Sequence, residues 1–258
     1  MQKEIIVSLQ NTRIKNVVVL REKSKERNRQ MLFPVEGRRE ISMAVSGGYE
    51  IESLFVCPEL SEGTDFPAKC IYEVSRKVFE KMAYREDSDG FLALVKMKSA
   101  SLHDIKISRN PFIIVLESVE KPGNLGAILR TADAANVDAV IVCDPKSDFF
   151  NPNVIRSSLG CVFTVNTVTC SSEQACEWLK KHNITVYAAE LESSQRYYNE
   201  DYTAGSAIVM GTESTGLSDF WLDRADKRIK IPMRGKVDSL NVSVSTAIIT
   251  FEAMRQRG

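Results

Sequence analysis

Residues 112–144 read FIIVLESVEKPGNLGAILRTADAANVDAVIVCD, and this stretch decides the fold class. Two continuous apolar runs, at 112–116 and 139–143, flank a segment with helical spacing that begins after Pro122 and Gly123. Strands that are apolar throughout are typical of parallel sheets, because helices cover both faces of such sheets. The stretch therefore predicts a strand, a crossover helix and a second parallel strand.

The same alternation of strand and helix continues to the end of the chain. Strand candidates are CVFTVNTV (161–168), TVYAAEL (185–191) and SAIVMGTE (206–213), and helix candidates are NPNVIRSSLG (151–160), SEQACEWLKKHN (172–183) and SLNVSVSTAIITFEAMRQ (239–256). We expect an α/β fold with a mostly parallel sheet and helices on both faces. Ligands bind beyond the carboxyl ends of strands in such sheets, so chemistry is expected in the loops after Glu117, Glu190, Gly211 and Ile231.

The N-terminal part of the chain has shorter elements, with helix candidates in REISMAVSGG (39–48) and SRKVFEKMAY (75–84) and strand candidates in MLFPVEG (31–37) and GFLALVKMK (90–98). The polar stretch SASLHDIKISRNP (99–111) has weak periodicity and ends in a proline, which is typical of a linker. We therefore expect a small α/β domain at residues 1–105 and a second domain at residues 106–258.

Bulk composition limits the class of protein. The chain has 34 basic and 34 acidic residues, but residues 1–30 hold eight basic and three acidic residues. This local basic excess is compatible with binding to RNA and equally with a solvent-exposed helix face. No apolar run of about 18 residues and no secretory leader is visible, so a cytoplasmic protein without a membrane span is expected. The six cysteines form no C-x-x-C pair and only two histidines occur, so neither a metal site nor a disulfide framework is indicated.

The first motif runs from Glu120 to Val142. Gly126 allows a ligand or another backbone to approach closely, and Asn124 and Arg130 are separated by about one and two-thirds helical turns. Both side chains are expected near the edge of a site. A loop followed by an ordinary helix start explains the pattern equally well when it is taken alone, and no G-x-G-x-x-G dinucleotide fingerprint is present.

The second motif is IVMGTESTGLS (208–218). An apolar strand leads into Gly211, then Glu213 and Gly216, so small residues line a turn at the carboxyl end of a strand. Such a turn can present backbone N–H and C=O groups to a cofactor. Any tight loop would share these features.

The third motif is IPMRGKVDSLNVSVSTAI (231–248). A short strand with Pro232 leads to Ser239 and Asn241 at the mouth of the terminal helix, where both residue types are good caps. Helix capping is thus the simpler interpretation of this motif in isolation. Within the helix, an apolar stripe indicates either packing against the sheet or a dimer interface, and it comprises Leu240, Val244, Ala247, Ile248, Phe251 and Met254.

In this order the three motifs closely resemble the SpoU (TrmH) family of RNA ribose methyltransferases, within the SPOUT superfamily. The matching elements are NLGAILRTADA, G-T-E-S-T-G-L-S and I-P-M-x-G-x-x-x-S-L-N-V-S-V, and the resemblance covers about residues 111–258. Residues 20–98 look more loosely like the RNA-binding domain that often precedes the catalytic domain. The chain departs from the family pattern at Thr212 and Ser214, where the family often has Asn or Ser and Gly.

The resemblance implies a deep trefoil knot in the C-terminal part, a homodimer, and S-adenosylmethionine held in the knot by backbone groups. It places the methyl donor against the loops at Leu191, Gly211, Ile231 and Leu240. It assigns the polar catalytic and substrate-binding roles to Asn124, Arg130, Glu213, Ser239 and Asn241.

The implied reaction is methyl transfer to a ribose 2′-hydroxyl of structured RNA, which requires alignment and loss of the hydroxyl proton. The resemblance makes Arg130 the candidate for the last role. A guanidinium that keeps its proton at neutral pH is a poor base. Stabilising the developing alkoxide, or clamping a neighbouring phosphate, suits it better.

The RNA itself is not fixed by the sequence, although the separate N-terminal domain favours ribosomal over transfer RNA. The alternatives are a tRNA 2′-O-methyltransferase, a base methyltransferase from another SPOUT branch, and a catalytically silent dimeric RNA-binding protein. The S-L-N-V-S element favours ribose as the target. The presence of all five polar residues argues against a catalytically silent RNA-binding protein, because a protein without catalysis need not retain them.

Overall fold

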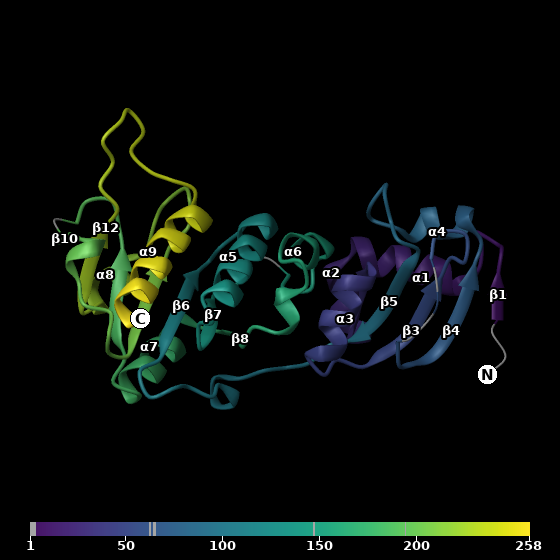
Figure 1. The fold of residues 1–258 in the computed structure, drawn as a ribbon, viewed down its shortest axis with the longest axis horizontal. Helices are drawn as coiled ribbons and strands as arrows, with labels where there is room; N and C mark the ends of the chain where they lie inside the picture. Colours follow the sequence, from purple (N-terminus) through teal and green to yellow (C-terminus); the bar gives the residue numbers. More distant parts are fainter. Residues whose placement is uncertain (1–3, 62, 64–65, 147, 194) are drawn as a thin grey trace. The chain divides into compact units, whose positions relative to one another are not determined.

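The computed structural model describes residues 4–61, 63, 66–146, 148–193 and 195–258 (Figure 1). The chain divides into two compact units, one made of residues up to Ser99 together with Asp148–Thr164, and one made of Ala100–Ser147 and Val165–Gly258. The sequence-based boundary between residues 105 and 106 lies six residues from the division after Ser99. The segment 148–164, which the sequence assigned to the second domain, packs in the first unit.

The first unit is a five-stranded sheet in the order β1-β4-β3-β5-β2. Strand β5 runs antiparallel to β2 and β3, while β4 pairs in parallel with β1 and β3. Its elements are β1 (Glu4–Ile6), α1 (Thr12–Glu22), α2 (Ser24–Gln30), β2 (Leu32–Glu36), α3 (Arg38–Ser46), β3 (Ile51–Val56), β4 (Ala68–Val74), α4 (Arg76–Met82), β5 (Phe91–Lys96), α6 (Pro152–Ser157) and the 3-10 turn η2 (Cys161–Phe163). The four elements expected from sequence between residues 31 and 98 are confirmed.

Aromatic stacking attaches the segment 148–164 to the first unit. The ring of Phe33 on β2 stacks on Phe150 at 4.2 Å and on Phe163 at 5.9 Å between centroids. Arg27, only 2% exposed, forms an ion pair with Asp148 at 2.5 Å. The expected strand over residues 161–168 is therefore wrong over residues 161–166, because Phe163 packs in this cluster and β8 begins only at Thr167.

The second unit contains a seven-stranded sheet in the order β10-β12-β9-β11-β6-β7-β8, and neighbouring strands of this sheet run parallel. Its elements are η1 (Leu102–Asp104), β6 (Phe112–Glu117), α5 (Pro122–Ala134), β7 (Ala139–Cys143), β8 (Thr167–Cys170), α7 (Ser172–Lys181), β9 (Thr185–Ala189), β10 (Gln195–Arg196), η3 (Tyr197–Asn199), β11 (Ser206–Met210), α8 (Asp219–Arg224), β12 (Lys227–Lys230) and α9 (Val242–Arg257). The mostly parallel α/β sheet expected from sequence is confirmed, whereas the knot stays a prediction.

Helices cover both faces of this sheet. Ile113 and Val115 of β6 share a buried cluster with Trp178 of α7 and Trp221 of α8. Alternate strand residues face opposite sides, so Ile114 and Leu116, which are also fully buried, point to the other face. There α5 and α9 lie side by side and contact β7 and β11 (Figure 1).

The apolar stripe of the terminal helix lies away from the core. The buried residues of α9 are Val242, Thr246, Ile249, Thr250 and Ala253, and none of these belongs to the stripe. Within the stripe, Val244 is 47% exposed and Phe251 is 50% exposed. Of the two interpretations that the sequence left open, packing within the chain therefore does not account for Val244 and Phe251, whereas Ala247, Ile248 and Met254 are half-buried. Among the residues described, no helix is both long and apolar enough to cross a membrane.

Candidate active site

The first motif places an amide at the carboxyl edge of the sheet. Helix α5 begins directly after the turn that follows β6, with Pro122 in its first turn, where the missing N–H of proline has no cost. Asn124 thus lies on the first turn of the helix, and its Nδ2 donates a hydrogen bond to Oε1 of Glu213. The two residues are 89 positions apart in the chain.

Glu213 is the centre of a polar network. Its Oε1 also accepts a hydrogen bond from Asn241 Nδ2 at 2.7 Å, and the same nitrogen lies 3.2 Å from Asn124 Oδ1. Its Oε2 forms an ion pair with the ammonium of Lys121. The hydrogen bond from Lys121 lowers the pKa of Glu213, helped by the Asn124 amide and opposed by partial burial. The carboxylate is therefore held ionised, as an acceptor for both amides.

Asn241 serves two purposes at once. Its Oδ1 accepts hydrogen bonds from the Ser243 N–H at 2.9 Å and the Ser243 hydroxyl at 2.6 Å, which caps α9. Its Nδ2 meanwhile donates to Glu213. The capping interpretation of the third motif is confirmed, and the other end of the same amide joins the network around Glu213.

Four loops at the same edge of the sheet surround a pocket of about 400 Å³. The four residues that the resemblance placed against the methyl donor all line it, namely Leu191, Gly211, Ile231 and Leu240. Ser239 lines it too, with its hydroxyl donating to Asp238 at 2.9 Å and not to Glu213. A second pocket of about 270 Å³ adjoins it, lined by Lys121 and Asn124, and the two share Glu213.

The pocket depends on a glycine cradle. A Cβ on Gly211 would lie 2.2 Å from the backbone carbon of Gly216, closer than real contacts allow. Thr212 and Gly216 exchange backbone hydrogen bonds of 3.0 and 3.1 Å, which close the loop. The Thr212 hydroxyl accepts the Thr215 N–H at 3.1 Å, so the side chain that departs from the family pattern stabilises the turn.

We expect Gly211→Ala to abolish binding of S-adenosylmethionine and to lower the melting temperature, because the added methyl group must displace backbone atoms of the loop. Gly123→Ala is the matched control: it lies in α5, a Cβ there meets nothing within 4 Å, and alanine is the better helix former. Calorimetric titration with the donor and thermal unfolding measure both effects. Unchanged donor affinity in Gly211→Ala would show that the cradle is not part of the donor site.

The structure does not bring Arg130 to the network. Its side chain is exposed on α5, and it lines neither of the two pockets. Conversely, Lys121 belongs to the network although sequence reasoning missed it, and its position directly before Pro122, in the loop after β6, could have suggested it.

Comparison with known proteins places this arrangement in a family. The SpoU rRNA Methylase family matches residues 111–251, and the MRM3-like substrate binding domain matches residues 11–93. The 23S rRNA (guanosine-2′-O-)-methyltransferase RlmB of Pasteurella multocida (strain Pm70) is 38% identical over 193 residues, which cover 71% of this chain and 78% of the relative. The 23S rRNA (guanosine(2553)-2′-O)-methyltransferase RlmP of Bacillus subtilis (strain 168) is 28% identical over 248 residues, 95% of this chain and 97% of the relative.

Solved structures agree with the sequence relatives over both units. A crystal structure of an RNA 2′-O ribose methyltransferase is 37% identical, covers 98% of this chain and 99% of its own, and superposes with a TM-score of 0.85. An AdoMet-bound rRNA methyltransferase from Sinorhizobium meliloti is 28% identical, covers 99% of this chain and 98% of its own, and gives a TM-score of 0.89. The chain belongs to the SpoU rRNA methylase family.

Proposed function

We propose that this protein transfers the methyl group of S-adenosylmethionine to a ribose 2′-hydroxyl of ribosomal RNA. The observation that carries the proposal is the pair of adjoining pockets that share Glu213, one lined by the expected donor-binding loops and one by Asn124 and Lys121. Two pockets side by side suit a donor and an acceptor held in line. The relatives named for 23S rRNA support ribosomal RNA over transfer RNA as the substrate.

The larger pocket fits the donor in its chemistry. Its walls combine apolar side chains such as Ile231 and Leu240 with the open backbone of the loop at Gly211, where only a glycine leaves room. An adenine and a short amino acid tail can bind to such apolar and main-chain surfaces. When bound, the donor supplies an electrophilic methyl group.

The chain's own residues would then position the acceptor. The ionised Glu213 fixes the amides of Asn124 and Asn241, so these side chains enter the reaction already oriented. Lys121 keeps the carboxylate charged and brings a positive charge to the smaller pocket, where an RNA phosphate can be attracted. Arg130 would stabilise the 2′-oxygen or clamp the neighbouring phosphate, and Ser239 would contact the substrate from the edge of the donor pocket.

A homodimer is the second part of the proposal. The exposed stripe of α9 offers large apolar side chains to water, which favours an interface over a solvated surface. We expect Phe251→Glu to convert the protein to a monomer, whereas Glu252→Gln on the same helix leaves the dimer intact. Light scattering after size-exclusion chromatography measures the mass, and a monomeric parent protein would refute the dimer.

The test of the function is methylation of RNA in the purified system. Ribosomal RNA from cells that lack the protein should accept the labelled methyl group, and mapping of ribose methylation should show one new alkali-resistant position. Transfer RNA as the only acceptor would favour the tRNA alternative. Donor binding without any transfer, or no donor binding at all, would favour the silent RNA-binding alternative. The N-terminal unit is proposed to hold the RNA, in keeping with its match to a substrate binding domain.

A further inference from the structure

An exposed tyrosine in the first unit lies on a backbone segment that is hydrogen-bonded to two charged side chains. Tyr84 follows α4 and is 45% exposed. On its N-terminal side, the guanidinium of Arg21 donates to the carbonyl of Ala83 at 2.6 Å and to that of Met82 at 3.3 Å. The carboxylate of Glu36 accepts the N–H of Tyr84 itself at 2.5 Å and, on the C-terminal side, that of Arg85 at 3.3 Å.

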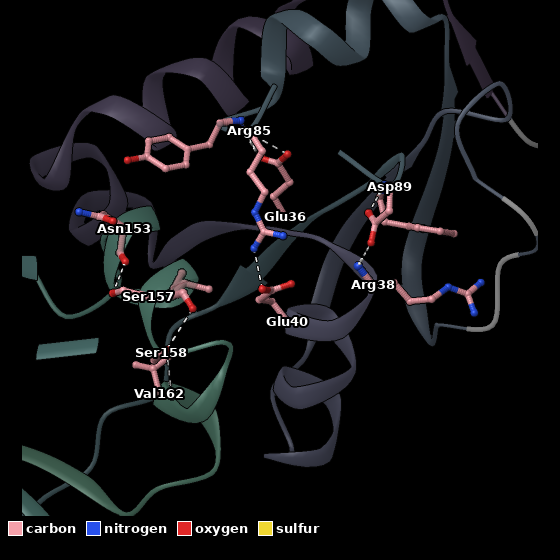
Figure 2. A network of polar contacts seen from close by, with 12 residues as sticks. Glu36, Arg38, Glu40, Arg85, Asp89, Asn153, Ser157, Ser158 and Val162 are labelled. Atoms are coloured by element: carbon pink, nitrogen blue, oxygen red, sulfur yellow. Dashed lines mark hydrogen bonds and ion pairs between the residues drawn. The ribbon is translucent and has the colours of Figure 1, made fainter. Parts of the chain in front are cut away.

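These clamps use charged groups that are costly to bury. Glu36 is only 9% exposed, and its carboxylate is directed at backbone N–H groups. Arg85 forms an ion pair at 2.6 Å with Glu40, whose side chain is 3% exposed, and Figure 2 shows Arg85 directed at that carboxylate. A buried carboxylate is tolerated only where such partners satisfy it. Charged side chains therefore hold the backbone that carries an exposed aromatic ring. A tyrosine that only contacts solvent does not require such a fixed backbone.

One arginine lies near the ring, and two others line a cavity beside it. The Arg156 guanidinium on α6 lies 6.0 Å from the centroid of the Tyr84 ring, and Arg156 is itself exposed. Arg21, Arg85 and Arg156 also line a narrow cavity beside Tyr84, with Pro34, Met82 and Leu92 among its apolar walls. At about 20 Å³ the cavity is too small for a nucleobase. A ligand would therefore lie across its mouth, on the exposed ring.

We propose that Tyr84 and Arg156 form a binding site for one unpaired nucleotide of the RNA substrate, with the base stacked on the tyrosine ring and its phosphate near the arginine. An aromatic face beside guanidinium groups is the chemistry that recognises single-stranded nucleotides, because every base has a stacking face. The acidic groups at this place are engaged, Glu36 by backbone N–H groups and Glu40 by Arg85. The site rests on the proposed RNA-modifying function and assigns part of the RNA contact to this face of the first unit.

The experiment measures binding of fluorescein-labelled single-stranded decamers of uridine and of adenosine, and of an RNA duplex of ten base pairs, to the full chain by anisotropy. Tyr84→Ala should weaken binding of the single strands about 10-fold, as expected for loss of one base stack, and leave duplex binding unchanged. Tyr84→Phe should bind like the parent, and Arg156→Ala should weaken binding and reduce its salt dependence.

The matched control is Tyr198→Ala. Tyr198 is 39% exposed and also carries an arginine, Arg196, 6.0 Å from its ring, but it lies in the second unit and lines none of the pockets described here. We expect no change in RNA affinity. The site is refuted if Tyr84→Ala binds single strands as tightly as the parent, if Tyr198→Ala weakens binding equally, or if duplex and single strand lose affinity together.

Methylation assays separate this site from the proposed function. Tyr84→Ala should raise the KM for ribosomal RNA and leave kcat and the affinity for S-adenosylmethionine unchanged. A parent protein that methylates ribosomal RNA but shows no dependence on Tyr84 would refute the site alone. A parent protein that binds single strands through Tyr84 but methylates no RNA would refute the function alone.

Discussion

Glu213→Ala is expected to lower kcat/KM for methylation of ribosomal RNA by about 100- to 1,000-fold, the loss seen when one preorganised polar contact is removed from an active site. The carboxylate is the common partner of Lys121, Asn124 and Asn241. Without it, the two amides lose the acceptor that orients them and the ammonium loses its counter-charge. Steady-state kinetics with purified ribosomal RNA measures the effect.

Two further variants make the prediction specific. Glu213→Gln keeps an oxygen for the amides but places an NH₂ group against the Lys121 ammonium, so an intermediate loss is expected. Glu177→Ala removes an exposed carboxylate of α7 that lines neither of the two pockets, and it should retain activity within a few-fold of the parent. Equal losses in Glu213→Ala and Glu177→Ala would contradict a specific role for the network.

Arg130→Ala is expected to abolish turnover and to leave the affinity for S-adenosylmethionine unchanged. The guanidinium lies outside both pockets, so donor binding does not depend on it. The reaction depends on it, because a guanidinium can stabilise a developing alkoxide or hold a phosphate. Arg130→Lys should recover little of the rate, because an ammonium lacks the bidentate geometry. Methylation at the parent rate by Arg130→Ala would show that the assignment is wrong.

Because Arg130 is exposed and lines neither pocket of its own chain, we expect it to act on the site of the partner subunit. Mixed dimers of one Arg130→Ala subunit and one Glu213→Ala subunit test this directly. If the arginine acts within its own chain, both sites are inactive. If it acts across the interface, Glu213 of the first subunit and Arg130 of the second form one intact site. Random pairing then restores about a quarter of the parent rate, because half of the dimers are mixed and each has one site. No recovery from two inactive parents would instead place Arg130 in its own chain's site.

Much of the second unit was predictable because it rests on local patterns. Apolar runs at 112–116 and 139–143 determined two neighbouring parallel strands, and Pro122 and Asn241 marked the starts of α5 and α9. The order of the three motifs identified the family. The four loops expected to hold the donor do line one pocket, since parallel strands end at one edge of the sheet.

Other features depended on contacts between distant parts of the chain. Residues 161–163 are apolar enough for a strand, yet stacking of Phe163 on Phe33 holds them in a 3-10 turn within the first unit. Lys121 had only its place before Pro122 as a signal, and its ion pair with Glu213 is what joins it to the network. The exposure of Phe251 could not be predicted either, because an apolar stripe alone does not show which face of the helix packs on the sheet.

The sequence by itself determined the fold class, the family and the residue types available for methyl transfer. Periodicity and motif order can be read along the chain without knowing which residues are in contact. Only the tertiary structure decided that Asn124, Glu213 and Asn241 form one hydrogen-bonded network and that Arg130 stands apart from it. The physical reason is distance along the chain. Asn124 and Asn241 are 117 residues apart, and their meeting depends on how seven strands order themselves in a sheet, which no local pattern encodes.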